Sequence, residues 1–148
     1  MVYKTDSEQQ TEQLGGAFAG QAARFRVIAL RGPLGAGKTA FTRGLARGLG
    51  YTGRVTSPTY AIINEYALPR PLYHFDMYRI TAEDQLYELG WEDYLASEAL
   101  CVVEWSENIE GALPKDTCFV DIAVTGDTGR EISIYTNTPE GRHDHFGT

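Results

Sequence analysis

The sequence predicts an α/β protein with three α/β/α layers, in which helices cover both faces of a mixed, mainly parallel sheet that ends in an antiparallel C-terminal hairpin. Helix-like and strand-like segments follow one another through the first hundred residues. The apolar run 99–103 has no alternating polar residues, which is typical of a central strand covered on both faces. Residues 117–136 form two strand-like runs around a Gly-Asp-Thr-Gly turn, which predicts the hairpin.

The N-terminal third predicts two helices with a strand between them. A helix over 7–23 begins at Ser7, a good N-cap residue, and its apolar residues recur every four positions. The apolar segment 25–30 predicts a strand. A second helix over 38–49 has its apolar residues on one face and is closed by Gly50, since glycine readily adopts the conformation that ends a helix.

The middle of the chain predicts a second hairpin and a third helix. Segments 59–68 and 71–79 are rich in aromatic and β-branched residues and are joined by a short Pro-Arg-Pro sequence. Such a short connection predicts two adjacent antiparallel strands. Residues 81–97 have a helical pattern, and Thr81 is the expected N-cap.

Length and composition limit the kind of protein that this chain can be. We expect the 148 residues to form one domain over 1–136, followed by a polar tail over 137–148. Hydrophobic residues make up 43% of the chain, which is typical of a globular protein, and no apolar run is long enough to span a membrane. Cys101 and Cys118 lie in apolar runs, where buried free thiols are expected. With no leader pattern at the N-terminus, a cytoplasmic protein is expected.

The clearest motif is GPLGAGKT at residues 32–39, which satisfies the G-x-x-x-x-G-K-[ST] pattern of a phosphate-binding loop. It follows a predicted strand and opens a predicted helix, as a phosphate-binding loop requires. Glycines allow successive backbone N–H groups to turn toward the phosphates, and the helix N-terminus adds positive potential. Lys38 is expected to reach the outer phosphates, and the hydroxyl of Thr39 is expected to bind Mg²⁺.

A nucleotide site of this kind also needs a carboxylate at the end of a neighbouring strand to hold the metal. Glu104 directly follows the apolar run 100–103, and Asp76 lies near the end of another predicted strand. Either carboxylate could be the ligand, although the buried run favours Glu104 because it delivers that side chain to the sheet edge where ligands bind. Residues 54–60, RVTSPTY, are either a segment that senses the outer phosphate or an ordinary turn.

Charge is distributed unevenly along the chain. Residues 24–79 hold nine Lys or Arg and two acidic residues, whereas residues 80–148 hold three basic and fifteen acidic residues. We expect the basic charge to gather around the loop, where it would favour an anionic nucleotide. The acidic second half argues against a free-standing nucleic-acid-binding protein.

Several classes of nucleotide-binding protein can be compared with these features. A GTP switch is excluded because the chain has no N-K-x-D motif, and a molecular motor needs a much longer chain. A slow ATPase that acts on a partner protein agrees best with the sequence. A small P-loop kinase that phosphorylates a metabolite and a module whose nucleotide binding alone controls an interaction are the alternatives.

The motifs in their order resemble the TsaE (YjeE) family, the ATPases of bacterial tRNA threonylcarbamoyladenosine biosynthesis. The resemblance is carried by the loop at 32–39 and by TSPTY (56–60), YHFDMYR (73–79), ELGWEDYL (88–95) and VEW (103–105). It implies a P-loop NTPase fold, ATP and Mg²⁺ as cofactors, and work with a threonylcarbamoyltransferase subunit and that subunit's inactive homologue. It also implies that tRNA is engaged indirectly, through this complex.

The resemblance implies a role for each matching residue. Lys38, Asp76 and Glu104 would be catalytic, and Thr39 and Glu104 would bind the metal. Residues 57–60 would form a switch-like segment. The residues expected to bind the nucleotide are Gly32, Gly35, Ala36, Gly37, Lys38, Thr39, Ala40, Ser57 and Thr59.

Overall fold

The computed structural model describes residues 1–58 and 62–136. In this part of the chain seven strands form one sheet: β1 (Val2–Thr5), β2 (Val27–Arg31), β3 (Ile63–Tyr66), β4 (Leu72–Asp76), β5 (Leu100–Glu104), β6 (Cys118–Val124) and β7 (Arg130–Thr136). Their order is β1-β7-β6-β2-β5-β4-β3. The three central pairings are parallel, and antiparallel strands extend the sheet at both edges.

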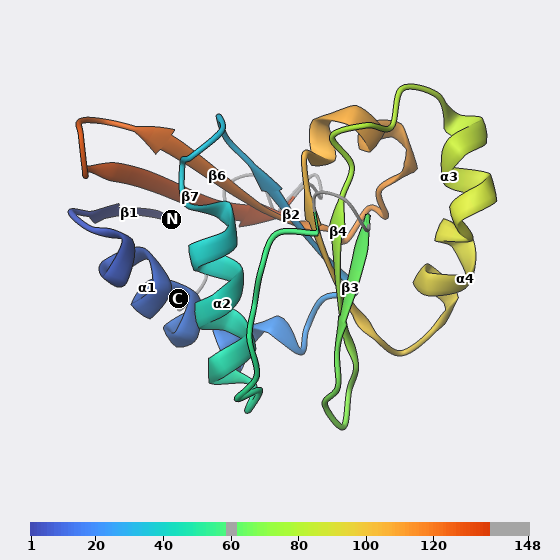
Figure 1. The fold of residues 1–148 in the computed structure, drawn as a ribbon, viewed down its shortest axis with the longest axis horizontal. Coiled ribbons are helices and arrows are strands. Elements are labelled where there is room, and N and C mark those ends of the chain that lie inside the picture. The colour runs from blue at the N-terminus through green and yellow to red at the C-terminus, as the bar shows by residue number, and fades with distance from the viewer. Residues whose placement is uncertain (59–61, 137–148) are drawn as a thin grey trace.

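Helices cover both faces of this sheet, so the predicted three-layer architecture is confirmed (Figure 1). The described helices are α1 (Glu8–Ala22), α2 (Lys38–Gly48), α3 (Glu83–Leu89), α4 (Trp91–Ala96) and the 3₁₀ helix η1 (Ser106–Ala112). Figure 1 shows α1 and α2 together on one side, with α3 and α4 on the other. None of these helices is both long and apolar enough to cross a membrane.

Strand β5 shows how the sheet separates the two cores. All five of its residues are buried. Leu100 and Val102 pack in the core on the α1 and α2 side, while Cys101 and Val103 pack in the core of the other side. This alternation follows from the two-residue period of a strand, and it confirms the prediction of a central strand covered on both faces.

Local signals account for the ends of the first two helices. The Ser7 hydroxyl accepts a hydrogen bond from the Gln10 backbone N–H at 3.1 Å, which confirms the predicted N-cap of α1. Helix α2 begins at Lys38, directly after the glycine loop. Gly50 has a φ of 105° just beyond the end of α2, as expected of a glycine that closes a helix.

The single helix predicted over 81–97 is wrong, because the structure has two short helices there. Gly90 has a φ of 83° and separates α3 from α4, since this left-handed conformation ends one helix and redirects the chain. The N-cap is Ala82 rather than Thr81. The Gln85 side-chain oxygen instead accepts from two backbone N–H groups that precede the helix, those of Thr81 at 2.6 Å and Ala82 at 3.3 Å.

Both predicted hairpins are confirmed, and two further elements were not predicted. β3 pairs antiparallel with β4, and β6 pairs antiparallel with β7. β1 and η1 were missed because each is short and has no clear periodic pattern. The first residues of the predicted strand 59–68 and the predicted tail 137–148 lie outside the described residues.

Candidate functional site

A cavity of about 770 Å³ lies where the carboxyl ends of β4 and β5 meet the loop that follows β2. The wall of this cavity brings together residues that the sequence places far apart: the start of α2 from Lys38 to Ala40, with Ser57, Asp76 and Glu104. The carboxyl edge of parallel strands is the usual place for ligands in open α/β sheets. The structure therefore places these predicted site residues on one surface.

The glycine loop has a backbone that other residues would not easily adopt. Gly35 and Gly37 have φ values of 78° and 113°, in the left-handed region that favours glycine. A Cβ on Gly32 would lie 2.6 Å from the Ile122 carbonyl oxygen, so a side chain there would collide with β6. Ala36 is fully buried between these glycines. These constraints explain why the loop can turn within so few residues between β2 and α2.

Lys38 lies at the start of α2 with its ammonium inside the site. Its Nζ donates a hydrogen bond to the Gly32 carbonyl at 2.7 Å and lies 3.8 Å from the centre of the Trp105 ring. Trp105 has a φ of 58°, a left-handed conformation that is uncommon outside glycine, directly after the end of β5. Burial lowers the pKa of Lys38, and the nearby charge of Glu104 acts in the opposite direction.

Asp76 and Glu104 end two neighbouring parallel strands. They are register partners of β4 and β5, and their exposed fractions are only 7% and 4%. The Thr39 hydroxyl donates to Glu104 Oε2 at 3.2 Å, whereas Asp76 Oδ1 accepts from the Tyr78 backbone N–H at 2.9 Å. The two carboxylates therefore occupy different positions, with only Glu104 in contact with the start of α2.

The oxygen atoms of Thr39 and Glu104 could hold a divalent cation. Within residues 1–58 and 62–136, no group of three or more His, Cys, Asp or Glu side chains is arranged as a complete metal site. Mg²⁺ commonly binds one or two protein oxygens and completes its shell with water and substrate phosphates. A hydroxyl and a carboxylate beside a phosphate-binding loop are suitable ligands for Mg²⁺. They do not form a site in which the protein supplies every ligand.

Two further residues that were predicted to bind the nucleotide also line the cavity. Ala40 lies in the first turn of α2, is almost fully buried and contributes to the cavity wall. Ser57 also lines the cavity, so the segment predicted either to sense the outer phosphate or to form a turn reaches the site. Thr59 and Tyr60 lie outside the described residues.

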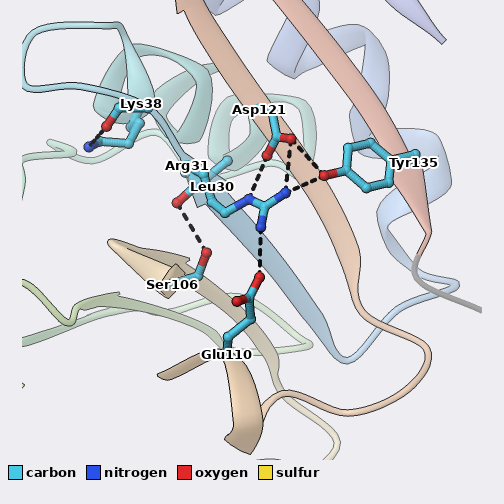
Figure 2. Close-up of polar contacts among 8 residues, drawn as sticks. Leu30, Arg31, Lys38, Ser106, Glu110, Asp121 and Tyr135 are labelled. Atoms are coloured by element: carbon cyan, nitrogen blue, oxygen red, sulfur yellow. Dashed lines mark hydrogen bonds and ion pairs between the residues drawn. The ribbon is translucent and has the colours of Figure 1, made fainter. Parts of the chain in front are cut away.

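Arg31, the last residue of β2, is a structural anchor that the sequence did not reveal. Figure 2 shows its guanidinium between Asp121 and Tyr135 on one side and Glu110 on the other. Arg31 binds the Asp121 carboxylate with two nitrogens, at 2.7 and 2.9 Å, and Glu110 at 2.9 Å. It also donates to the Tyr135 hydroxyl. The residue before the loop is thus tied to β6, β7 and η1.

Arg130, at the start of β7, supports the loop itself. Its guanidinium donates to the carbonyl oxygens of Ala36 at 2.9 Å and Gly35 at 3.2 Å. It also donates to the Gly129 carbonyl at 2.7 Å. Both Arg31 and Arg130 act on residues some 80 to 100 positions away, so no local pattern could have identified them.

Three arginines from the basic part of the chain, Arg43, Arg47 and Arg70, do not line the cavity, although basic charge was predicted to gather around the loop. Arg43 and Arg47 pair with acidic residues of α1, including Glu12 at 3.6 and 3.9 Å. Arg70 donates to the Glu98 and Phe25 carbonyl oxygens, both at 2.7 Å, near the opposite edge of the sheet. A count of charges along the chain could not show that these side chains are occupied elsewhere.

His74 also contacts the site, although no role was expected for it from the sequence. It is fully buried on β4, and its Nε2 lies 2.5 Å from Glu104 Oε2. The two-residue period of the strand places His74 on the same face as Asp76, and this pattern was available in the sequence.

Comparison with known proteins agrees with the resemblance noted in the sequence. The family model of the threonylcarbamoyl adenosine biosynthesis protein TsaE matches residues 5–132. A Bacillus subtilis (strain 168) protein named tRNA threonylcarbamoyladenosine biosynthesis protein TsaE is 42% identical over 135 residues, covering 90% of this chain and 84% of the relative. A Haemophilus influenzae protein of the same name is 39% identical over 118 residues, covering 79% and 74%.

A solved structure supports the same relationship. The crystal structure of Bacillus subtilis YdiB is similar to this chain with a TM-score of 0.75 and 36% sequence identity, covering 95% of this chain and 87% of that one. Sequence and fold therefore agree over nearly the whole described region. This chain belongs to the TsaE family of threonylcarbamoyl adenosine biosynthesis proteins.

Proposed function

We propose that this protein is the magnesium-dependent ATP-binding and ATP-hydrolysing subunit of the machinery that adds threonylcarbamoyl to the adenosine beside the tRNA anticodon. The names of its relatives support the pathway. One observation supports ATP binding and hydrolysis: a single cavity beside the glycine loop is lined by Lys38, Thr39, Asp76 and Glu104.

Each of these residues has a defined task in the proposal. Backbone N–H groups of the loop bind the phosphates, and the Lys38 ammonium neutralises the outer ones. Thr39 and Glu104 hold Mg²⁺, which neutralises charge on the phosphate oxygens when it is bound. Asp76 orients or deprotonates the attacking water, because its carboxylate lies at the next strand end without contacting Thr39.

Hydrolysis by the isolated chain should be slow. Arg130 is the one arginine among the described residues that line the cavity, and its donors are already bound to backbone carbonyl groups. An additional arginine at the transferred phosphate can accelerate the reaction by about a thousandfold or more. We infer that the threonylcarbamoyltransferase subunit and its inactive homologue raise the turnover, either by completing the site or by ordering the segment that contains Ser57.

The decisive test removes the cation that faces the outer phosphates. Lys38→Ala should lower ATP affinity or turnover by about a hundredfold or more, because it removes a fixed positive charge from a partly dry site. Lys115→Ala is the matched control, since Lys115 is exposed and does not line the cavity. ATP binding, ATP hydrolysis and tRNA modification in the reconstituted system should all be measured.

Three results would contradict the proposal. A folded Lys38→Ala protein with wild-type ATP binding and hydrolysis would exclude this site. Transfer of labelled γ-phosphate to a small molecule instead of water would favour a metabolite kinase. Full tRNA modification with a non-hydrolysable ATP analogue would favour a binding module over an ATPase.

A further inference from the structure

The buried imidazole of His74 has a polar partner at each ring nitrogen. Its Nε2 lies 2.5 Å from Glu104 Oε2, and its Nδ1 lies 3.0 Å from the Tyr66 hydroxyl oxygen. Tyr66 comes from β3, the antiparallel neighbour of β4, and is itself buried. Because a buried polar group without a partner is costly, these two contacts determine how the ring is oriented.

The direction of these contacts depends on the tautomer of His74, and we assign it from the acceptor that faces Nε2. Glu104 Oε2 is a carboxylate oxygen that accepts, so we assign the hydrogen of this short contact to His74 Nε2. With one ring hydrogen, placed on Nε2, Nδ1 is an acceptor, and we assign the Tyr66 hydroxyl as its donor. Burial raises the pKa of Tyr66, which keeps the phenol protonated and able to donate.

The Tyr66 hydroxyl has a second acceptor within reach. Its oxygen lies 3.2 Å from the Thr56 carbonyl oxygen, which also accepts from Asn64 Nδ2 at 3.0 Å. One hydroxyl hydrogen can serve either His74 or Thr56 fully, but not both. Thr56 directly precedes Ser57 in the cavity wall, so a shift of this backbone changes what Tyr66 can donate to His74.

We propose that His74 is a positioning residue which, together with Tyr66, couples the carboxylate of Glu104 to the backbone at Thr56. This proposal rests on the proposed function, in which Glu104 binds the metal. A hydrogen bond from Tyr66 to Nδ1 polarises the ring and strengthens the bond from Nε2 to Glu104. When Thr56 takes that hydrogen, the support is withdrawn and Glu104 is held less firmly.

In this proposal the segment before Ser57 has two states: in one Tyr66 donates to His74, and in the other it donates to the Thr56 carbonyl. The two states differ in how firmly Glu104 is held. A ligand can shift such an equilibrium only if its contacts differ between the states. Here the difference is the strength of one hydrogen bond to Glu104 Oε2, the oxygen that also accepts from Thr39. Magnesium affinity and the conformation of residues 54–57 should therefore change together.

Two substitutions at His74 separate its two contacts. The amide of Gln reaches the place of Nε2, whereas the shorter amide of Asn reaches the place of Nδ1. His74→Asn should raise the Mg²⁺ concentration needed for half-maximal binding of a non-hydrolysable ATP analogue by about ten- to hundredfold, as is typical when a metal ligand loses its orienting partner. His74→Gln should recover most of that loss.

Tyr66→Phe removes the hydroxyl that contacts His74 Nδ1 and preserves the buried aromatic ring. It should raise the same Mg²⁺ midpoint by about three- to tenfold, the range expected for one buried hydrogen bond. Tyr73→Phe is the matched control on the same hairpin, because Tyr73 lies on the opposite face of β4 and packs against Tyr94. It should leave the midpoint unchanged.

Hydrogen exchange at residues 54–57 provides a readout that does not depend on catalysis. In the wild-type protein, adding Mg²⁺ to the complex with the analogue should change the exchange rates of these amides. In Tyr66→Phe that response should be much smaller, while nucleotide affinity without Mg²⁺ stays near the wild-type value. This pattern distinguishes coupling from a general loss of stability.

These measurements distinguish a failure of the proposed function from a failure of the proposed coupling. If the wild-type protein shows no Mg²⁺-dependent nucleotide binding, the proposed function is wrong and this inference falls with it. If wild type shows that dependence but His74→Asn and Tyr66→Phe keep the wild-type midpoint, only the coupling is wrong. Equal weakening with and without Mg²⁺ would also overturn the coupling, because it would show a purely structural role.

Discussion

The two helical layers of this protein pack in different ways. On one face, α1 and α2 approach backbone to backbone: a Cβ on Gly44 would lie 1.7 Å from the Glu12 carbonyl oxygen, and one on Gly15 would lie 2.2 Å from that of Phe41. On the other face, aromatic rings fill the space. Phe75 of β4 meets Trp91 of α4 edge to face, with ring centres 5.2 Å apart.

This difference indicates which of the two helical layers supports the site rigidly. Helix α2 carries the end of the glycine loop, and its contact with α1 leaves no room for adjustment because backbone atoms meet directly. The layer of α3 and α4 covers the sheet through side chains, which can reorient when a neighbour changes. We therefore expect changes in the first layer to reach the nucleotide site, and changes in the second to affect mainly stability.

The largest change in the free energy of unfolding should come from a substitution in the layer of α3 and α4. Trp91→Ala should lower the free energy of unfolding by about 3–5 kcal/mol, because it leaves a cavity beside Phe75 and removes the indole hydrogen bond to the Ala112 carbonyl. Chemical denaturation measures this loss, and Trp91→Phe should recover part of it. ATP titration of the folded variant should give nearly the wild-type affinity; a large loss of affinity would end the distinction between the two layers.

A smaller loss of stability, but a clear loss of binding, should follow from Gly44→Ala. The added methyl group must displace α2 from α1, at a cost of about 1–3 kcal/mol in the free energy of unfolding. The displaced helix moves the start of the phosphate-binding loop, so nucleotide affinity should fall as well. Both quantities can be measured on one preparation, by denaturation and by calorimetric titration with ATP.

Gly20→Ala is the control for that substitution. Gly20 lies in α1, and a Cβ there would meet no atom within 4 Å. The change should raise the free energy of unfolding by about 0.5–1 kcal/mol through helix propensity, without altering ATP binding. If Gly44→Ala destabilised the protein yet bound ATP like Gly20→Ala, the contact between α1 and α2 would not control the loop.

A third comparison separates the roles of Glu104 and Asp76, the two carboxylates on the sheet face that α2 covers. Asp76→Asn should change the free energy of unfolding only slightly. Glu104→Ala should weaken the magnesium dependence of ATP binding by about tenfold or more, since even residues that only orient a metal ligand contribute that much. Asp76→Asn should slow hydrolysis by about a hundredfold and leave binding nearly intact. A magnesium titration disturbed by Asp76→Asn and not by Glu104→Ala would reverse the two assignments.

The parts of the fold that could be predicted from the sequence are those whose motif or residue pattern lies within a short stretch of the chain. The GPLGAGKT motif occupies eight consecutive residues, and the continuous apolar run before Glu104 indicated a central strand. The rule that carboxyl ends of parallel strands meet at one sheet edge was enough to expect Glu104 and Asp76 near the loop. The break at Gly90 was also visible as a glycine, but the helical pattern on both sides hid it.

The sequence alone was sufficient to predict the phosphate-binding loop, most of the helices and strands, both hairpins and two of the carboxylates that line the cavity, Asp76 and Glu104. The charged side chains that support that site could be identified only in the folded protein. Arg31 and Arg130 hold the loop, whereas Arg43 and Arg47 bind α1, and His74 contacts Glu104. The reason is physical: helix and strand patterns are set by neighbours a few residues away, but a salt bridge or buried hydrogen bond depends on where distant segments meet after packing.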